Sequence, residues 1–150
     1  MIYYRSWSCY CLLFLAAIAL GACGGKGGGN QFRVGFSQCG EDDAWRRSMI
    51  SDMRRELAFY PEMRLLYKQA NDSSLLQVQQ VKELLKEGID LLIISPNEAE
   101  PLTPVVEEVF SKGIPVIVVD RKTASALYTN YIGANNYEIG KMAGAYARSI

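Results

Sequence analysis

Short apolar runs recur along the chain and are separated by longer amphipathic stretches. The runs at 32–37 (FRVGFS), 91–95 (LLIIS) and 116–120 (VIVVD) are largely apolar, 63–68 is weaker and 131–133 is short. Apolar runs of this length without strict alternation predict strands that are buried on both faces of a sheet.

The intervening stretches carry apolar residues at every third or fourth position, which predicts amphipathic helices. These helices are expected at 45–57, 75–85, 102–110 and 139–150. Short polar side chains can accept hydrogen bonds from the free N–H groups of a helix start, so Asp42 or Asp43 and Ser73 or Ser74 are the expected N-caps. Pro61, Gly88 and Gly113 are the expected stops.

The spacing of the predicted strands indicates the fold class. Strand starts near residues 32, 63, 91 and 116 lie about 25 to 31 residues apart, which is the length of a βαβ unit. The prediction is an α/β protein with a doubly wound parallel sheet covered on both faces. Ligands of such sheets bind outside the carboxyl ends of the strands, where the strand order switches.

Residues 1–22 are predicted to be a secretory signal peptide. They carry one charge, Arg5, and an apolar run at 11–20 that is too short for a membrane span of about 20 residues. The following LGAC, ending at Cys23, resembles the lipobox of bacterial lipoproteins, which implies a lipidated Cys23. The alternative is a plain signal peptide or an uncleaved anchor, with a cysteine at position 23 by chance. Residues 24–30 are glycine-rich and precede the first strand, which favours a flexible tether over a phosphate loop.

Composition excludes several classes of function. The chain has 150 residues with 16 Lys and Arg against 16 Asp and Glu, a formal net charge of +0 and no histidine. It lacks the basic excess of non-specific nucleic-acid binding and the imidazole of Ser–His–Asp or Cys–His catalysis. No metal site and no cofactor are predicted. Loss of the signal peptide and lipidation of Cys23 leave Cys39, expected to be a small turn residue and not a nucleophile.

The residues that follow the predicted strands suit a sugar. Asp120 offers acceptors and Arg121 offers a planar set of donors, so together they can pair with neighbouring hydroxyl groups. Trp45, followed by Arg46, begins the first helix and can stack against the C–H face of a sugar ring. The alternatives are a core role for Trp45, a helix-cap or loop carboxylate at Asp120 and a solvated pair at Arg121 and Lys122. Asn71 and Asn97 are more typical of turns.

Three long motifs carry a family resemblance. They are VGFSQCGEDDAWRR at 34–47, SPNEAEPLTPVVEEVFSKGIPVIVVDRK at 95–122 and YIGANNYEIGKMAG at 131–144. They resemble the ribose/galactofuranose-type periplasmic sugar-binding proteins, which have the type I periplasmic binding protein fold. Within that family they most resemble the periplasmic sensor region of carbohydrate-sensing hybrid two-component proteins.

The resemblance implies a site. It assigns sugar contacts to Trp45, Arg46, Asp120 and Arg121, and the Trp-Arg pair is similar to that of furanose binders. Ser37, Ser95 and Asn97 fall in neighbouring loops of the family pattern. Family members have two lobes, so 31–150 is expected to be the N-terminal lobe of a longer protein, truncated before the second lobe.

Several functions are compatible with this pattern. The leading expectation is a periplasmic, membrane-anchored sugar sensor that passes closure to a histidine kinase domain. The second is the solute-binding lipoprotein of an ABC sugar importer, with a permease as partner, which Cys23 and the tether favour. A cytoplasmic repressor with this fold is disfavoured by the signal peptide. An enzyme is disfavoured because no catalytic group of residues is present.

Overall fold

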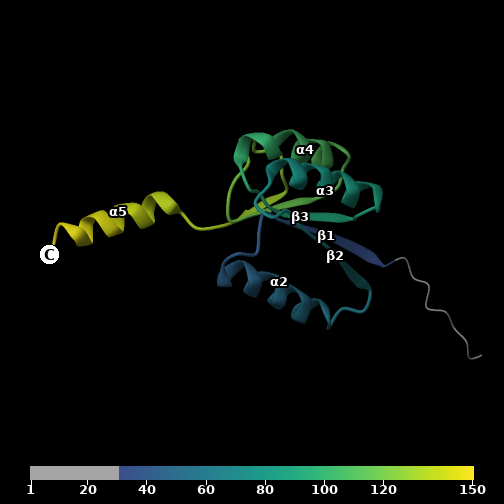
Figure 1. The fold of residues 1–150 in the computed structure, drawn as a ribbon, viewed down its shortest axis with the longest axis horizontal. Coiled ribbons are helices and arrows are strands. Elements are labelled where there is room, and N and C mark those ends of the chain that lie inside the picture. The colour runs from purple at the N-terminus through teal and green to yellow at the C-terminus, as the bar shows by residue number, and fades with distance from the viewer. Residues whose placement is uncertain (1–30) are drawn as a thin grey trace, which may run out of the picture. The chain divides into compact units, whose positions relative to one another are not determined.

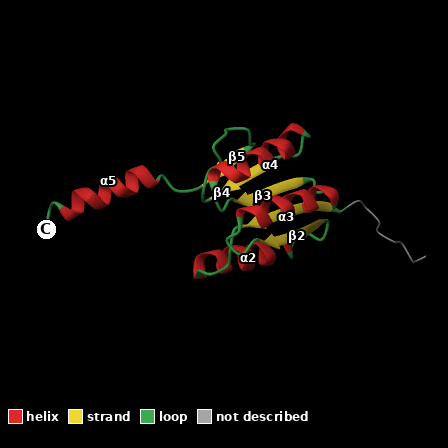
Figure 2. Cartoon of the chain, turned by 45° about the horizontal axis from the view of Figure 1, so that its top comes forward, coloured by secondary structure: helices red, strands yellow, loops and turns green. Residues whose placement is uncertain are grey.

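The computed structural model describes residues 31–150, so the predicted signal peptide, Cys23 and the tether lie outside the described residues. It contains one five-stranded sheet, in the order β2-β1-β3-β4-β5, with every neighbouring pair parallel (Figure 2). The strands are β1 (Phe32–Gln38), β2 (Met63–Gln69), β3 (Leu91–Ser95), β4 (Val116–Val119) and β5 (Asn130–Ile132). The helices are α2 (Ala44–Leu57), α3 (Ser74–Lys86), α4 (Ala99–Ser111) and α5 (Asn136–Ala147).

The doubly wound parallel sheet is confirmed. Helices α3 and α4 cover one face of the sheet and α2 lies on the other (Figure 1). Each strand and helix lies within a few residues of its predicted position. None of the helices in residues 31–150 is long and apolar enough to cross a membrane.

The main core lies between the sheet and the α3–α4 layer. Its members are aliphatic side chains that are almost completely buried: Val81, Leu84, Leu92, Ile94, Leu102, Val105, Val106, Val109, Val116 and Val118. Burial of one such side chain contributes about 1.5–3 kcal/mol. Gly35 in β1 permits this packing, because a Cβ there would lie 2.9 Å from the Ile89 side chain.

Helix α2 covers its face of the sheet less completely. Ile50 is the one buried residue of α2, and Met49, Met53 and Leu57 are only half-buried. Together with Val34, Leu91 and Ile93, these three residues line an open groove of about 710 Å³ between α2 and the sheet. The groove exists because α2 packs mainly towards the β2 side of the sheet and leaves part of β3 uncovered.

Local signals mark the starts and ends of the helices at the positions that the sequence predicts. Of the alternative N-caps, Asp43 accepts from the backbone N–H of Arg46 and Ser73 accepts from that of Leu76. Gly88 and Gly113 follow α3 and α4 with φ of 73° and 78°, a left-handed conformation that glycine adopts without steric cost.

Two elements differ from expectation. Strand β4 ends at Val119, one residue early, because Asp120 has φ of 68° and leaves the extended conformation. Helix α5 forms with Asn135 as its N-cap, but none of its residues is buried. Its apolar residues Ile139, Met142 and Tyr146 are therefore at least half exposed, although their spacing is that of an amphipathic helix.

Two leucines of α3 test this division between core and surface. Leu84 is fully buried and Leu75 is 72% exposed. Leu84→Ala is expected to lower the free energy of unfolding by about 2–5 kcal/mol, because it removes transfer energy and leaves a cavity. The matched variant Leu75→Ala is expected to change it by less than about 0.5 kcal/mol. Urea unfolding of both variants measures the difference, and equal losses would contradict the assigned core.

Candidate ligand-binding site

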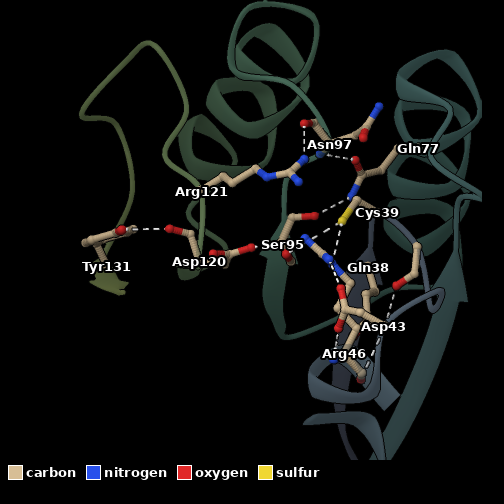
Figure 3. Close-up of polar contacts among 11 residues, drawn as sticks. Gln38, Cys39, Asp43, Arg46, Gln77, Ser95, Asn97, Asp120, Arg121 and Tyr131 are labelled. Atoms are coloured by element: carbon tan, nitrogen blue, oxygen red, sulfur yellow. Dashed lines mark hydrogen bonds and ion pairs between the residues drawn. The ribbon is translucent and has the colours of Figure 1, made fainter. Parts of the chain in front are cut away.

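The loops after β1, β3 and β4 meet at one edge of the sheet (Figure 3). Strand β1 pairs with β2 on one side and with β3 on the other, so the direction of winding reverses between β1 and β3. Parallel strands have their carboxyl ends at the same edge, and the reversal opens a crevice there. The candidate site is built on this edge.

Arg46 is the centre of the site. Its Nε donates to Cys39 Sγ at 3.2 Å, Nη2 donates to Asp120 Oδ2 at 3.3 Å, and Nη1 donates to the Asp43 carboxylate. The side chain is only 15% exposed. A guanidinium group has five N–H donors, so two remain for a ligand. Arg46 thus joins the loop after β1 to the loop after β4 and still has donor capacity.

The surroundings of Arg46 keep both Arg46 and Asp43 ionised. Burial alone would lower the pKa of Arg46, but the Cys39 sulfur and the Asp43 carboxylate raise it, and the net shift is upward. Asp43 accepts from the Arg46 backbone N–H at 2.7 Å. This bond, together with the guanidinium, lowers the pKa of the Asp43 carboxyl. Arg46 stays cationic and Asp43 stays anionic at neutral pH.

Asp120 is held in an uncommon backbone conformation. Its φ of 68° is left-handed, a conformation that is uncommon outside glycine but that Asp adopts more readily than most residues. Its N–H donates to the Ile132 carbonyl at 2.9 Å, and its own carbonyl accepts from Tyr131 Oη at 2.7 Å. Asp120 is therefore not a helix cap. One carboxylate oxygen faces Arg46, and the other has no hydrogen-bond partner in residues 31–150.

Trp45 stands next to this ion pair. Its side chain is 53% exposed, so the alternative that it is a core residue is wrong. The Arg46 guanidinium carbon lies 6.0 Å from the centre of the Trp45 ring. Trp45 lines the groove under α2, and Asp120 lines an open polar hollow of about 600 Å³ beside β5. Trp45 and Asp120 thus line different concave surfaces, and Arg46 is next to both residues.

Arg121 and Asn97 connect the neighbouring loops. Arg121 Nη1 donates to the Asn97 carbonyl at 2.7 Å, so Arg121 is not merely solvated. The Asn97 side chain donates to Asp72 O and Ser74 Oγ, both at 2.9 Å, which is the turn role anticipated as its alternative. Lys122 lies over the Tyr131 ring at 4.6 Å from its centre.

The two serines are separated by strand alternation. Ser37 pairs in register with Ile94, and its hydroxyl accepts from Gln77 of α3 at 3.2 Å, so it lies under α3 and away from Arg46. Ser95 pairs with Gln38 and lies 4.0 Å from Cys39 Sγ on the side of Arg46. Both are fully buried. The structure therefore brings Ser95 to the cluster and Ser37 to the helix packing.

Three residues contribute to the site in ways that the sequence analysis did not predict. Cys39 is a fully buried acceptor for Arg46, not just a turn residue. Gln38 donates to the carbonyls of Gly40 and Arg46 and so fixes the loop after β1. Asp43 could have been found, because an N-cap carboxylate three residues before an arginine has the spacing of a helical ion pair. Residues 31–150 contain no cluster of ligand side chains able to hold a metal ion.

Comparison with known proteins shows the family. Residues 34–149 match the family model described as the periplasmic binding protein domain. The chain belongs to the periplasmic binding protein family. Its sheet is part of the N-terminal lobe of the type I periplasmic binding protein fold. Members of the family are binding proteins, so this part of the chain is a binding domain, and a periplasmic location follows from the family.

Three relatives of this periplasmic binding protein are informative. The solved fructose-binding periplasmic domain of a hybrid two-component system is 50% identical with a TM-score of 0.76, covering 79% of this chain and 39% of that one. The ribose import binding protein RbsB of Bacillus subtilis is 25% identical, covering 81% of this chain and 39% of its own length. The galactofuranose-binding protein YtfQ of Escherichia coli is 29% identical, with 74% and 36% covered. The chain thus spans about two fifths of the length of these three relatives.

The lowered pKa of Asp43 makes a prediction about acid stability. Asp43→Asn keeps an acceptor for the Arg46 N–H but removes the charge. Because the folded-state pKa lies below the ordinary value of 3.8, the stability from this charge is present above that value and is lost as pH falls through the folded-state pKa. The difference in unfolding free energy between wild type and Asp43→Asn is therefore expected to shrink below about pH 4.

Urea unfolding at a series of pH values measures this difference. Ser73→Ala provides the control, since it removes the N-cap of α3 through a hydroxyl that does not titrate in this range. Its effect is expected to vary less with pH. A difference for Asp43→Asn that is constant down to about pH 3 would contradict the assigned role of the charge.

Proposed function

We propose that this domain binds a monosaccharide in its furanose form and acts as the sensor domain of a hybrid two-component protein. The observation that carries the proposal is the Arg46–Asp120 pair beside the exposed ring of Trp45. It lies where the loops after β1 and β4 meet, at the ligand-binding edge of a doubly wound sheet.

The chemistry of these three side chains matches that of a sugar. Each sugar hydroxyl both donates and accepts hydrogen bonds. The free Asp120 oxygen accepts from one hydroxyl, and the two unused N–H groups of Arg46 donate to its neighbours. Trp45 offers a rigid apolar surface for the C–H face of the ring. The side chains of Arg46 and Asp120 are mostly buried, which strengthens these bonds relative to bonds made in water.

The furanose and sensor parts of the proposal draw on the relatives. The relative that is 50% identical is named as fructose-binding and as part of a hybrid two-component system. YtfQ is named as galactofuranose-binding. We propose that a second lobe closes over the sugar, as in hinged binding proteins, and that closure is transmitted to a histidine kinase domain.

The site is tested by the thermal stability of the full-length protein with and without saturating sugar. A ligand at about 100 times its Kd stabilises a protein by about 2.7 kcal/mol, so D-fructose is expected to raise the Tm of the wild type. Trp45→Ala and Asp120→Ala are each expected to abolish this rise, because each removes a sugar contact. The Tm without sugar should change little for Trp45→Ala, since its side chain is largely exposed.

Phe59→Ala and Glu100→Ala are matched controls. They remove an exposed aromatic ring and an exposed carboxylate outside the site, and the sugar-dependent rise is expected to persist in both. An undiminished rise in Trp45→Ala and Asp120→Ala would refute the site. No rise in the wild type with D-fructose, D-ribose or D-galactose would refute sugar binding.

A solute-binding lipoprotein of an ABC importer is the second candidate, with a membrane permease as its partner. It is favoured by the match to the ribose import binding protein and by the LGAC sequence ending at Cys23, whose lipidation and membrane anchoring stay predictions.

Gene deletion distinguishes the two candidates. Loss of a sensor is expected to abolish sugar-induced transcription while uptake of labelled sugar continues in cells that express the transporter from a constitutive promoter. Loss of an importer component is expected to abolish uptake in the same cells. Retained induction together with lost uptake would refute the sensor proposal and support the importer.

A further inference from the structure

We infer that Cys39 is a positioning residue that sets the orientation of the Arg46 guanidinium towards the ligand. This inference rests on the proposed function, because it gives Cys39 a part in the affinity of that same site. Cys39 follows β1 directly and is 1% exposed. Its sulfur is therefore shielded from solvent, and its polar contacts lie inside the site.

The contacts of Cys39 link Arg46 to the sheet. Its Sγ accepts from Arg46 Nε at 3.2 Å and lies 4.0 Å from Ser95 Oγ at the end of β3. Its carbonyl accepts from the Asp72 N–H at 2.7 Å, which fixes the backbone that carries the thiol. Figure 3 shows the Cys39 sulfur beside both the Arg46 guanidinium and Ser95.

The three hydrogen-bond acceptors of the Arg46 guanidinium, which are Asp43, Asp120 and Cys39, restrain different parts of the group. Asp43 holds Nη1 from the same helical turn and therefore moves with Arg46. Asp120 holds Nη2 from the loop after β4. Two contacts on the Nη atoms only weakly restrain tilting of the planar group about the line that joins them. The contact at Nε, which lies in the same plane but off that line, restrains this tilt.

The donors left for the sugar depend on that plane. Both unused N–H groups are on Nη1 and Nη2, and hydrogen bonds weaken steeply as their angle departs from linearity. Without Cys39 Sγ, the Nε–H group would also be partly buried without an acceptor, which favours rearrangement of the guanidinium. Sulfur is a weak acceptor, but the charge on the donor strengthens the bond.

The inference is tested with three variants of the full-length protein and D-fructose, using calorimetry to measure Kd. Cys39→Ala is expected to weaken binding about tenfold, which corresponds to a loss of about 1.4 kcal/mol. Cys39→Ser restores an oxygen acceptor at the same position and is expected to recover most of the affinity. Val106→Ala, a buried substitution in α4, is expected to lower stability without changing Kd.

A double-mutant cycle separates positioning from general destabilisation. If Cys39 acts through the guanidinium, Cys39→Ala has no further effect on Kd when Arg46 is already alanine. Full additivity of the two substitutions would overturn the inference, as would an unchanged Kd in Cys39→Ala alone. Millimolar D-fructose extends the measurable range for the weak variants.

A second measurement on the ligand-free protein keeps the inference distinct from the proposed function. The NMR order parameter of the Arg46 Nε–H bond is expected to be high in wild type and Cys39→Ser, and to fall below about 0.6 in Cys39→Ala. An unchanged order parameter in Cys39→Ala overturns the inference even if sugar binds. Failure of wild type to bind sugar, with the order parameter falling as expected, refutes the proposed function and leaves the positioning role of Cys39 supported.

Discussion

Parallel pairing of β1 with strands on both of its sides is the constraint on which the site depends. Because β1 lies between β2 and β3, its carboxyl end is flanked by two loops that turn in opposite directions. Residues that are 74 positions apart in the chain, Arg46 and Asp120, meet there. The same register decides which side chains take part, because neighbouring residues of a strand point to opposite faces.

Much of the fold could be predicted because its signals are local. Apolar runs, helical spacing and cap residues such as Asp43 and Ser73 are read from a few neighbouring positions. The gathering of Trp45, Arg46 and Asp120 at one edge also follows from strand direction alone. The place of Ser37 could not be predicted from these signals, since it depends on which face of β1 receives α3. The role of Cys39 depends on a contact with a side chain seven residues away in a different element, and no sequence pattern marks a thiol as an acceptor.

The charges of the proposed site suit a neutral ligand. Arg46 lies between the carboxylates of Asp43 and Asp120, so opposite charges balance over a short distance. An anionic ligand would meet the exposed oxygen of Asp120, and a cationic one would meet the free edge of Arg46. Each charged group is already partly satisfied within the protein, so binding a polyol adds hydrogen bonds without leaving an unpaired charge.

Helix α2 has few buried contacts with the sheet, and this affects the free energy of ligand binding. This helix carries Trp45 and Arg46 and has Asp43 as its N-cap, yet it contributes only Ile50 to the buried interior. Helix α3, by contrast, contributes Gln77, Val81 and Leu84. Elements with few buried contacts open at lower free energy than the rest of a domain. If the proposed ligand contacts Trp45 and Arg46, part of the free energy of that contact suppresses the local opening of α2, and occupancy of the site is then coupled to the order of this helix.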